Sequence, residues 1–116
     1  MSNRAERVAE AIRSELAELI RREVKDPRVE KAGLLTVTRV EVSKDISVAH
    51  VWVSFVGGKP EAAAAALAGL NASGFLRGEV GRRLSLRHAP DLRFRGDDTA
   101  EFLSRLDAAV REDKKE

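Results

Sequence analysis

The spacing of the apolar residues changes along this chain from a helical to an alternating pattern, and it does so twice. Helical spacing occupies residues 4–24 and 60–84, and alternation follows each of them, in residues 34–56 and 92–95. Apolar residues three or four apart share one face of a helix, whereas residues two apart share one face of a strand. The pattern therefore predicts an α+β fold with element order αββααβ and a three-stranded sheet.

The first helix has signals for its start and its end. Asn3 and Glu6 have capping-box spacing, and the residue before Pro27 is pushed out of the α region. We expect this helix to end near Val24 and residues 28–33 to form a polar connection. Its buried face would carry Val8, Ile12, Leu16, Leu19 and Ile20.

Two alternating runs predict a hairpin that reverses at Lys44-Asp45. In the first run, residues 34–43, strict alternation puts Thr36, Thr38, Val40 and Val42 on one face and Val37, Arg39 and Glu41 on the other. In the second, residues 48–56, we expect Ala49, Val51, Val53 and Phe55 on the core side, with His50, Trp52 and Ser54 opposite.

The second helical stretch is interrupted. It opens at Pro60, breaks at Ala72-Ser73-Gly74, and resumes with Leu76, Val80 and Leu84 as a buried stripe. We expect Gly74 to supply the unusual dihedral angles of the break. A third strand and an extra C-terminal helix from about Asp98 complete one domain at residues 1–111, followed by a charged tail at 112–116.

Composition narrows the class of protein. The chain has 116 residues, which fits a single domain. It has no cysteine, so disulfides, thiolate metal sites and cysteine nucleophiles are excluded. It also has no apolar run of membrane-spanning length and no signal core at its beginning, so we expect a cytoplasmic protein without membrane contact.

Positive charge is concentrated next to the break. Residues 71–95 contain six arginines and only two acidic residues, a net charge of +4 that exceeds the +2 of the whole chain. Such a patch favours a polyanion, with RNA or DNA as the leading candidate. The candidate RNA-binding residues are Arg77, Arg82, Arg83, Arg87, Ser73 and Gly74, with the helix N-terminus after the break as a phosphate site. The alternative for each arginine is a solvated helix position, or for Arg87 a cap on carbonyl groups.

The element order resembles that of a type II KH domain, a small fold that binds single-stranded nucleic acid. Among proteins with that fold, the sequence from about Arg4 to Leu106 resembles the bacterial ribosome-binding factor A family. An Ala-x-Gly break replaces the usual GxxG loop, and Gly78-Glu79-Val80-Gly81 is interpreted as a decoy inside the second helix of the pair. The supporting segments are Arg7-Val8, Asp26-Pro27-Arg28, residues 37–45, residues 49–54, Phe75-Leu76-Arg77, residues 82–87 and Pro90-x-Leu92-x-Phe94. Gly78 and Gly81 depart from the larger, often basic residues expected there.

The resemblance implies a non-enzymatic assembly factor without a cofactor or a metal. It would bind rRNA of the immature small ribosomal subunit near the decoding region and assist late maturation as a monomer, alongside assembly GTPases. A general single-stranded nucleic-acid-binding module is the alternative.

Two further readings of the residues stay open. Trp52 and His50 could stack bases, although a cation–π contact of Trp52 with Arg39 or Arg93 is favoured. His88, Asp97 and Asp98 could hold a metal ion for hydrolysis, although adjacent acids at a helix start are usually caps.

Overall fold

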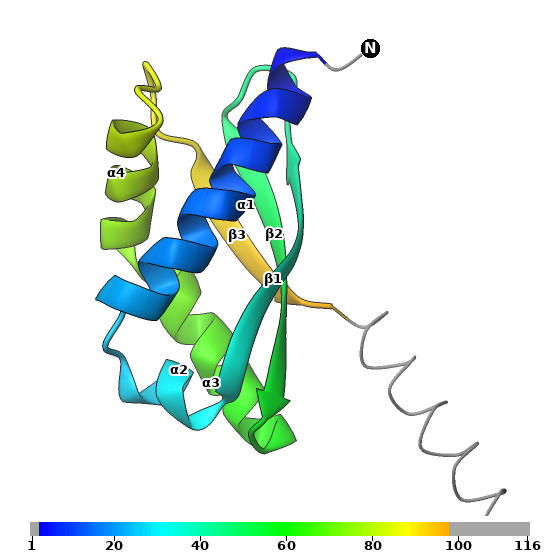
Figure 1. Cartoon of the computed structure of the whole chain (residues 1–116), viewed down its shortest axis with the longest axis vertical. Helices are drawn as coiled ribbons and strands as arrows, with labels where there is room; N and C mark the ends of the chain where they lie inside the picture. The colour runs from blue at the N-terminus through cyan, green and yellow to red at the C-terminus, as the bar shows by residue number, and fades with distance from the viewer. Residues whose placement is uncertain (1–2, 98–116) are drawn as a thin grey trace, which may run out of the picture.

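A computed structural model describes residues 3–97 of the chain, in which one layer of helices covers one face of a three-stranded sheet (Figure 1). The elements are α1 (Arg4–Glu23), α2 (Pro27–Lys31), β1 (Gly33–Val42), β2 (Val48–Gly57), α3 (Pro60–Asn71), α4 (Gly74–Arg83) and β3 (Asp91–Gly96). The predicted α+β class and αββααβ order are confirmed, with α2 as an addition. The predicted C-terminal helix, the domain boundary at 111 and the tail at 112–116 lie outside the described residues.

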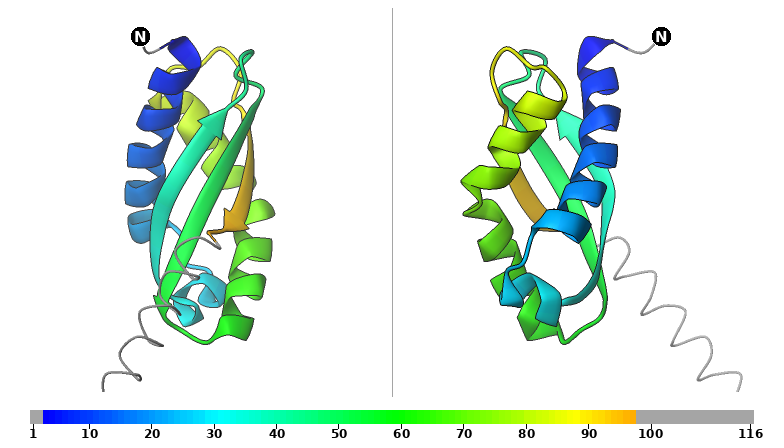
Figure 2. Two further views of the ribbon diagram at one scale, coloured as in Figure 1. Left: turned by 90° about the vertical axis from the view of Figure 1, so that its right-hand side faces the viewer. Right: turned by 60° about the vertical axis from the view of Figure 1, so that its left-hand side comes forward.

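The sheet has the order β1-β2-β3. β1 and β2 form the predicted antiparallel hairpin, whereas β2 and β3 are parallel. Parallel neighbours need a long crossover connection, and α3 and α4 supply it. Figure 2 shows the consequence: the right view looks onto the helices, and the left view looks onto the strands, whose other face is not covered by any helix of residues 3–97.

The N-terminal helix begins as predicted. The Asn3 side chain accepts a hydrogen bond from the Glu6 N–H at 2.9 Å, and the Glu6 carboxylate accepts from the Asn3 N–H at 3.3 Å, which completes the capping box. The polar connection predicted for residues 28–33 is wrong, because α2 occupies most of it. Asp26 caps α2 and a proline stands at its first position, which are strong helix-start signals.

The predicted faces of β1 are partly wrong because the strand contains a bulge. The pairing register with β2 shifts between Val37 and Arg39, leaving Thr38 as an extra residue. Val37 is therefore buried, while Thr36, predicted on its opposite face with Val40, is exposed. Leu35 and Val37 before the bulge and Val40 and Val42 after it face the core together.

A hydrogen-bond network closes the β1–β2 hairpin at the predicted reversal. The Asp45 carboxylate accepts from the Ser47 hydroxyl at 2.7 Å and N–H at 3.1 Å and from the Ser43 hydroxyl at 2.8 Å. These bonds, from Ser47 first and then Ser43, hold the pKa of Asp45 below its usual value. The turn therefore favours the ionised form of the Asp45 carboxyl.

The core lies between the sheet and the helices, and every element contributes to it. The predicted inward residues of β2 are confirmed, since Ala49, Val51 and Val53 are fully buried. The remaining core residues are Ile12, Leu16, Leu19, Ile20, Val29, Ala32, Val37, Ala66, Leu70, Leu76, Val80, Leu92 and Phe94.

No helix within residues 3–97 has the length and apolar character to cross a bilayer.

Candidate RNA-binding site

The break between α3 and α4 falls where the sequence predicts it, but glycine does not make it. Ala72 ends α3 with φ −84° and ψ −6°, and Ser73 is extended with φ −83° and ψ 100°. The Ser73 hydroxyl then accepts a hydrogen bond from the Leu76 N–H at 3.3 Å. Gly74 is the exposed first residue of α4, and positive φ occurs at Gly33 and Gly57 instead. The expectation of unusual dihedrals at Gly74 is wrong, because a serine N-cap suffices to restart the helix.

α4 presents a bare surface at its beginning. A methyl group added at Gly74 or at Gly78 would meet no atom within 4 Å, and Phe75 between them is 49% exposed. On the opposite side, Leu76 and Val80 are fully buried. The predicted position of Gly78–Gly81 inside the second helix of the pair is confirmed, since both glycines lie in α4. Its interpretation as a decoy stays a prediction.

Two of the predicted arginines differ in their freedom. The Arg77 guanidinium donates to the Ala89 carbonyl from Nε at 3.3 Å and from Nη2 at 3.2 Å, so it ties α4 to the segment before β3. Arg87 lies in that segment and is exposed. It makes no hydrogen bond or ion pair to residues 3–97, which removes the carbonyl-capping alternative for the described part of the chain. Arg87 is thus available to an anion, whereas the Ala89 carbonyl orients the Arg77 guanidinium but does not neutralise its charge.

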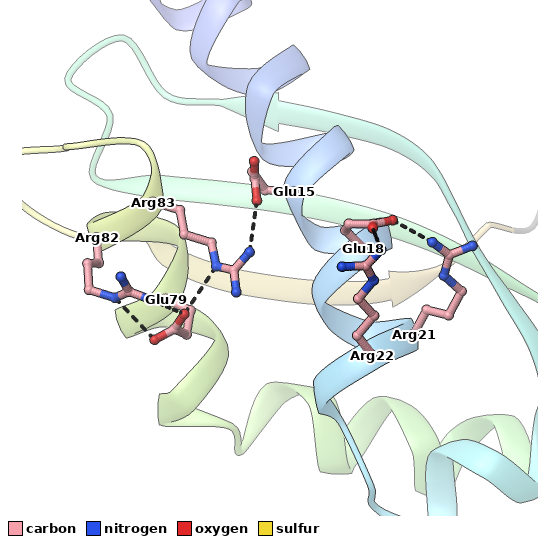
Figure 3. Close-up of polar contacts among 7 residues, drawn as sticks. All are labelled: Glu15, Glu18, Arg21, Arg22, Glu79, Arg82 and Arg83. Carbon is pink, nitrogen blue, oxygen red and sulfur yellow. Dashed lines mark hydrogen bonds and ion pairs between the residues drawn. The ribbon is translucent and has the colours of Figure 1, made fainter.

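Arg82 and Arg83 share one carboxylate (Figure 3). Glu79 lies 2.6 Å from Nη2 of Arg82 and 3.1 Å from Nε of Arg83. Glu15 of α1 lies 3.6 Å from Nη1 of Arg83, which links the two helices. The hydrogen bonds from Arg82 and then Arg83 lower the pKa of Glu79, and Glu79 raises the pKa of Arg82. The side chain of Arg82 is 69% exposed and that of Arg83 34%.

The cluster of Arg82, Arg83 and Arg87 lies at the C-terminal end of α4. We predicted these arginines beside the helix N-terminus, and that placement is wrong. Eight residues separate Gly74 from Arg82, which at ~1.5 Å per residue is about 12 Å. The candidate anion-binding groups thus lie at both ends of α4, and a strand of nucleic acid would have to run along the exposed face of this helix to reach both.

Sequence reasoning missed the contribution of α1. Glu15 is distant in sequence from α4, so no local pattern could identify it as the partner of Arg83. Near it on α1, Glu18 pairs with Arg21 at 2.6 Å and with Arg22 at 3.0 Å (Figure 3). The i,i+3 and i,i+4 spacing of that trio was a readable signal.

The uncovered face of the sheet gathers the tryptophan and further arginines. The Arg39 guanidinium lies 3.9 Å from the centroid of the Trp52 ring, and that of Arg95 lies 5.3 Å from it. The predicted cation–π contact with Arg39 is confirmed. Arg93 was the wrong alternative, because it pairs with Asp91 at 3.2 Å.

The metal site considered from His88, Asp97 and Asp98 does not form among the described residues. His88 precedes β3 and Asp97 follows it, so six strand residues, or about 20 Å, separate them. The Thr38 hydroxyl donates to the Asp97 carboxylate at 2.5 Å, and Asp98 lies outside the described residues. Residues 3–97 contain no other group of three ligating side chains that could hold a metal ion.

Comparison with known proteins gives one consistent result. The family model described as "Ribosome-binding factor A" matches residues 4–110. A ribosome-binding factor A of Thioalkalivibrio sulfidiphilus is 47% identical over 116 residues, covering 97% of this chain and 88% of the relative. One of Thiobacillus denitrificans is 49% identical, covering 97% and 91%.

Solved structures agree with the sequence comparison. The crystal structure of ribosome-binding factor A from Thermus thermophilus is 33% identical, with a TM-score of 0.66 over 81% of this chain and 97% of that one. A homology model of the Thermus thermophilus factor, fitted into a cryo-EM map of its complex with the 30S subunit, is 34% identical. Its TM-score is 0.57, over 75% of this chain and 88% of that one.

Proposed function

Because this chain belongs to the ribosome-binding factor A family, we propose that it binds the small ribosomal subunit. The fitted complex of the Thermus thermophilus relative with the 30S subunit supports this proposal. The chain covers 88% and 91% of the length of two of these relatives. Its role is that of a non-catalytic assembly factor.

The partner within the subunit is rRNA, and the recognition surface is α4. One observation carries this: Arg82, Arg83 and Arg87 are exposed at one end of α4, and the bare backbone of Gly74 is exposed at the other. The helix N-terminus has N–H groups and a partial positive charge for one phosphate. The arginines offer planar forks for further phosphates along the same strand.

Glu79 prepares the two helical arginines for this exchange. It holds Arg82 and Arg83 side by side in the free protein, and an ion pair with a partner as exposed as Arg82, at 69%, contributes little to stability. An RNA phosphate can therefore replace the carboxylate at small cost. The arginines are pre-positioned without being locked.

The biological setting follows from the family. The factor binds the immature small subunit near the decoding region during late maturation, in the cytoplasm, as a monomer and alongside assembly GTPases. It leaves when maturation is complete. These statements predict a preference for precursor particles over mature ones.

Co-sedimentation with precursor and mature small subunits tests the proposal. The parent chain should pellet with precursors, and the double variant Arg82→Glu/Arg83→Glu should not. Lys25→Glu/Lys31→Glu makes the same charge change at exposed positions before and within α2, and should behave like the parent. Equal sedimentation of both double variants would refute the role of α4.

Salt dependence tests the number of phosphate contacts. The three arginines of the cluster, Arg82, Arg83 and Arg87, should contribute about −2 to the slope of log affinity for single-stranded RNA against log salt. Each further arginine that contacts a phosphate, Arg77 included, should make the slope steeper by about 0.7. Similar affinities for free DNA, free rRNA and subunits would instead favour a general single-stranded nucleic-acid-binding module.

A further inference from the structure

The uncovered sheet face carries two cross-strand rungs of polar and aromatic side chains. Arg39 of β1, Trp52 of β2 and Arg95 of β3 stand in register, and Glu41, His50 and Arg93 form the next rung. Adjacent rungs on one face of a sheet lie close enough for long side chains to touch. The His50 and Trp52 rings accordingly have centroids 6.2 Å apart, at an interplanar angle of 45°.

The first rung gathers two guanidinium groups around the indole of Trp52. The Arg39 guanidinium at 3.9 Å is in stacking contact with the indole, and Arg95 flanks the same ring at 5.3 Å. A guanidinium is planar and weakly hydrated, so it stacks on aromatic groups at low desolvation cost. Arginine and tryptophan together thus make a platform whose shape and π-character match a nucleic acid base.

The charges of this face distinguish the platform from the α4 surface. Arg93 pairs with Asp91 at 3.2 Å, and Arg39 lies 3.7 Å from Glu41, both as exposed surface pairs. Arg95 makes no ion pair within residues 3–97. Among the described residues, one cation therefore lacks an ion pair and a second is loosely held, which suits a single phosphate beside a stacked base and does not suit a run of phosphates.

A hollow extends from the platform to Asn71, the residue before the helix break. Its volume is about 1070 Å³, and Arg39, Trp52, Arg95 and the side chain of Asn71 are among the residues that line it. Asn71 accepts from the Phe94 N–H at 2.7 Å and donates to the Phe94 carbonyl at 3.0 Å. Asn71 directly precedes Ala72-Ser73-Gly74, so these two hydrogen bonds hold the helix break against the free edge of β3. The same strand carries Arg95 on the uncovered face.

We propose that the Arg39–Trp52–Arg95 rung is a second RNA contact, which stacks one unpaired base of the strand bound along α4 after that strand crosses β3. The proposal rests on the proposed function, since it extends the same RNA across the molecule. Arg95 holds the phosphate beside that base. The occupant is single-stranded RNA, because a paired base cannot offer its face to the indole.

Trp52 is the only tryptophan of the chain, so its fluorescence reports on the platform directly. Titration with a single-stranded oligoadenylate, within the ~4–16 nucleotides that such surfaces cover, should quench the emission in proportion to the fraction bound. Fluorescence anisotropy of end-labelled RNA measures the total binding in parallel. Saturated anisotropy without a change in tryptophan emission would overturn the proposal.

Substitutions measure the contribution of stacking. Trp52→Leu should weaken oligoadenylate binding by about 5- to 150-fold, and Trp52→Phe by less, because the benzene ring still stacks. Leu34→Ala is the matched control: Leu34 is 69% exposed on the same face, at the end that β3 does not reach, and its loss should leave the affinity unchanged. Equal affinity of Trp52→Leu and the parent would also overturn the proposal.

Arg95→Gln provides a second variant that keeps the tryptophan and the packing beneath it. It should reduce the salt slope of RNA binding by about 0.7, the share of one phosphate, and shift the quenching curve to higher RNA concentration. An unchanged slope and curve would contradict the role of Arg95. This variant decides the matter even if Trp52→Leu fails to fold, which circular dichroism detects.

Failure of this proposal and failure of the proposed function give different results. If RNA binding depends on Arg82 and Arg83 but never quenches Trp52, the platform is refuted and the α4 site stands. If RNA quenches Trp52 but the chain does not sediment with small subunits, the platform stands and the ribosomal role is refuted. If Trp52→Leu weakens sedimentation with subunits but not RNA binding, the face meets a protein, and the RNA proposal is refuted.

Discussion

Two glycines in α4 provide a matched test of how this helix packs. Gly78 and Gly81 lie three residues apart in the same helix, so alanine at either position removes the same backbone freedom. Alanine is favoured over glycine inside a helix by about 0.8–1 kcal/mol. A Cβ at Gly78 would meet nothing within 4 Å, so Gly78→Ala should stabilise the fold by roughly 1 kcal/mol and raise Tm by roughly 5 °C.

Gly81 is different because another segment lies against it. A Cβ there would be 2.8 Å from the Cβ of Ala89 and 3.3 Å from its Cα, closer than real side chains approach. Relief requires the segment before β3 to move, and that segment is also held by Arg77 through the Ala89 carbonyl. Overpacking of this kind costs about 1–3 kcal/mol. Gly81→Ala should therefore be less stable than Gly78→Ala by about 1–3 kcal/mol.

Urea denaturation followed by circular dichroism measures both variants under one condition. The difference between them is the informative quantity, because the helix-propensity gain cancels. Both should keep the parent m-value, since neither changes the surface exposed on unfolding. If Gly81→Ala were as stabilising as Gly78→Ala, the close contact of α4 with Ala89 would not exist and this reasoning would be refuted.

Three other predictions concern single positions. Asn71→Ala should lower the free energy of unfolding, measured by urea denaturation, by about 1–2 kcal/mol, because the Phe94 N–H and carbonyl lose their hydrogen-bond partner. An unchanged value would mean that these two bonds do not stabilise the edge of β3. Ser85→Gly should stabilise the folded protein by about 0.5–1 kcal/mol, because Ser85 follows the end of α4 with φ 53°, a conformation that glycine adopts without strain. A lower Tm of this variant would argue against that geometry. The fold lowers the pKa values of Asp45 and Glu79, so the ionised carboxylates stabilise the folded protein fully above their unfolded pKa values and less as the pH falls. The free energy of unfolding should begin to fall near pH 4 and keep falling below it. A flat profile from pH 5 to 2 would contradict this.

The site shows where sequence reasoning worked and where it failed. The arginine concentration was visible in the text, and the buried stripe of Leu76 and Val80 put Arg82 on the outside correctly. The sequence could not reveal that Arg77 donates a hydrogen bond to the Ala89 carbonyl, because that bond joins α4 to a segment whose path depends on the whole crossover. Sequence order also suggested that all the arginines flank the break, whereas α4 carries the cluster away from it.

The sequence alone determined the order of the elements apart from α2, the position of the break and the inward face of β2. Each of these depends on periodicity, on caps and on proline, which act within a few residues of the chain. Tertiary structure alone decided the Thr38 bulge, the parallel placement of β3 beside β2, and the meeting of Arg39, Trp52 and Arg95. Those features depend on which strands pair and in what register, and pairing energies come from residues that the chain brings together only when it folds.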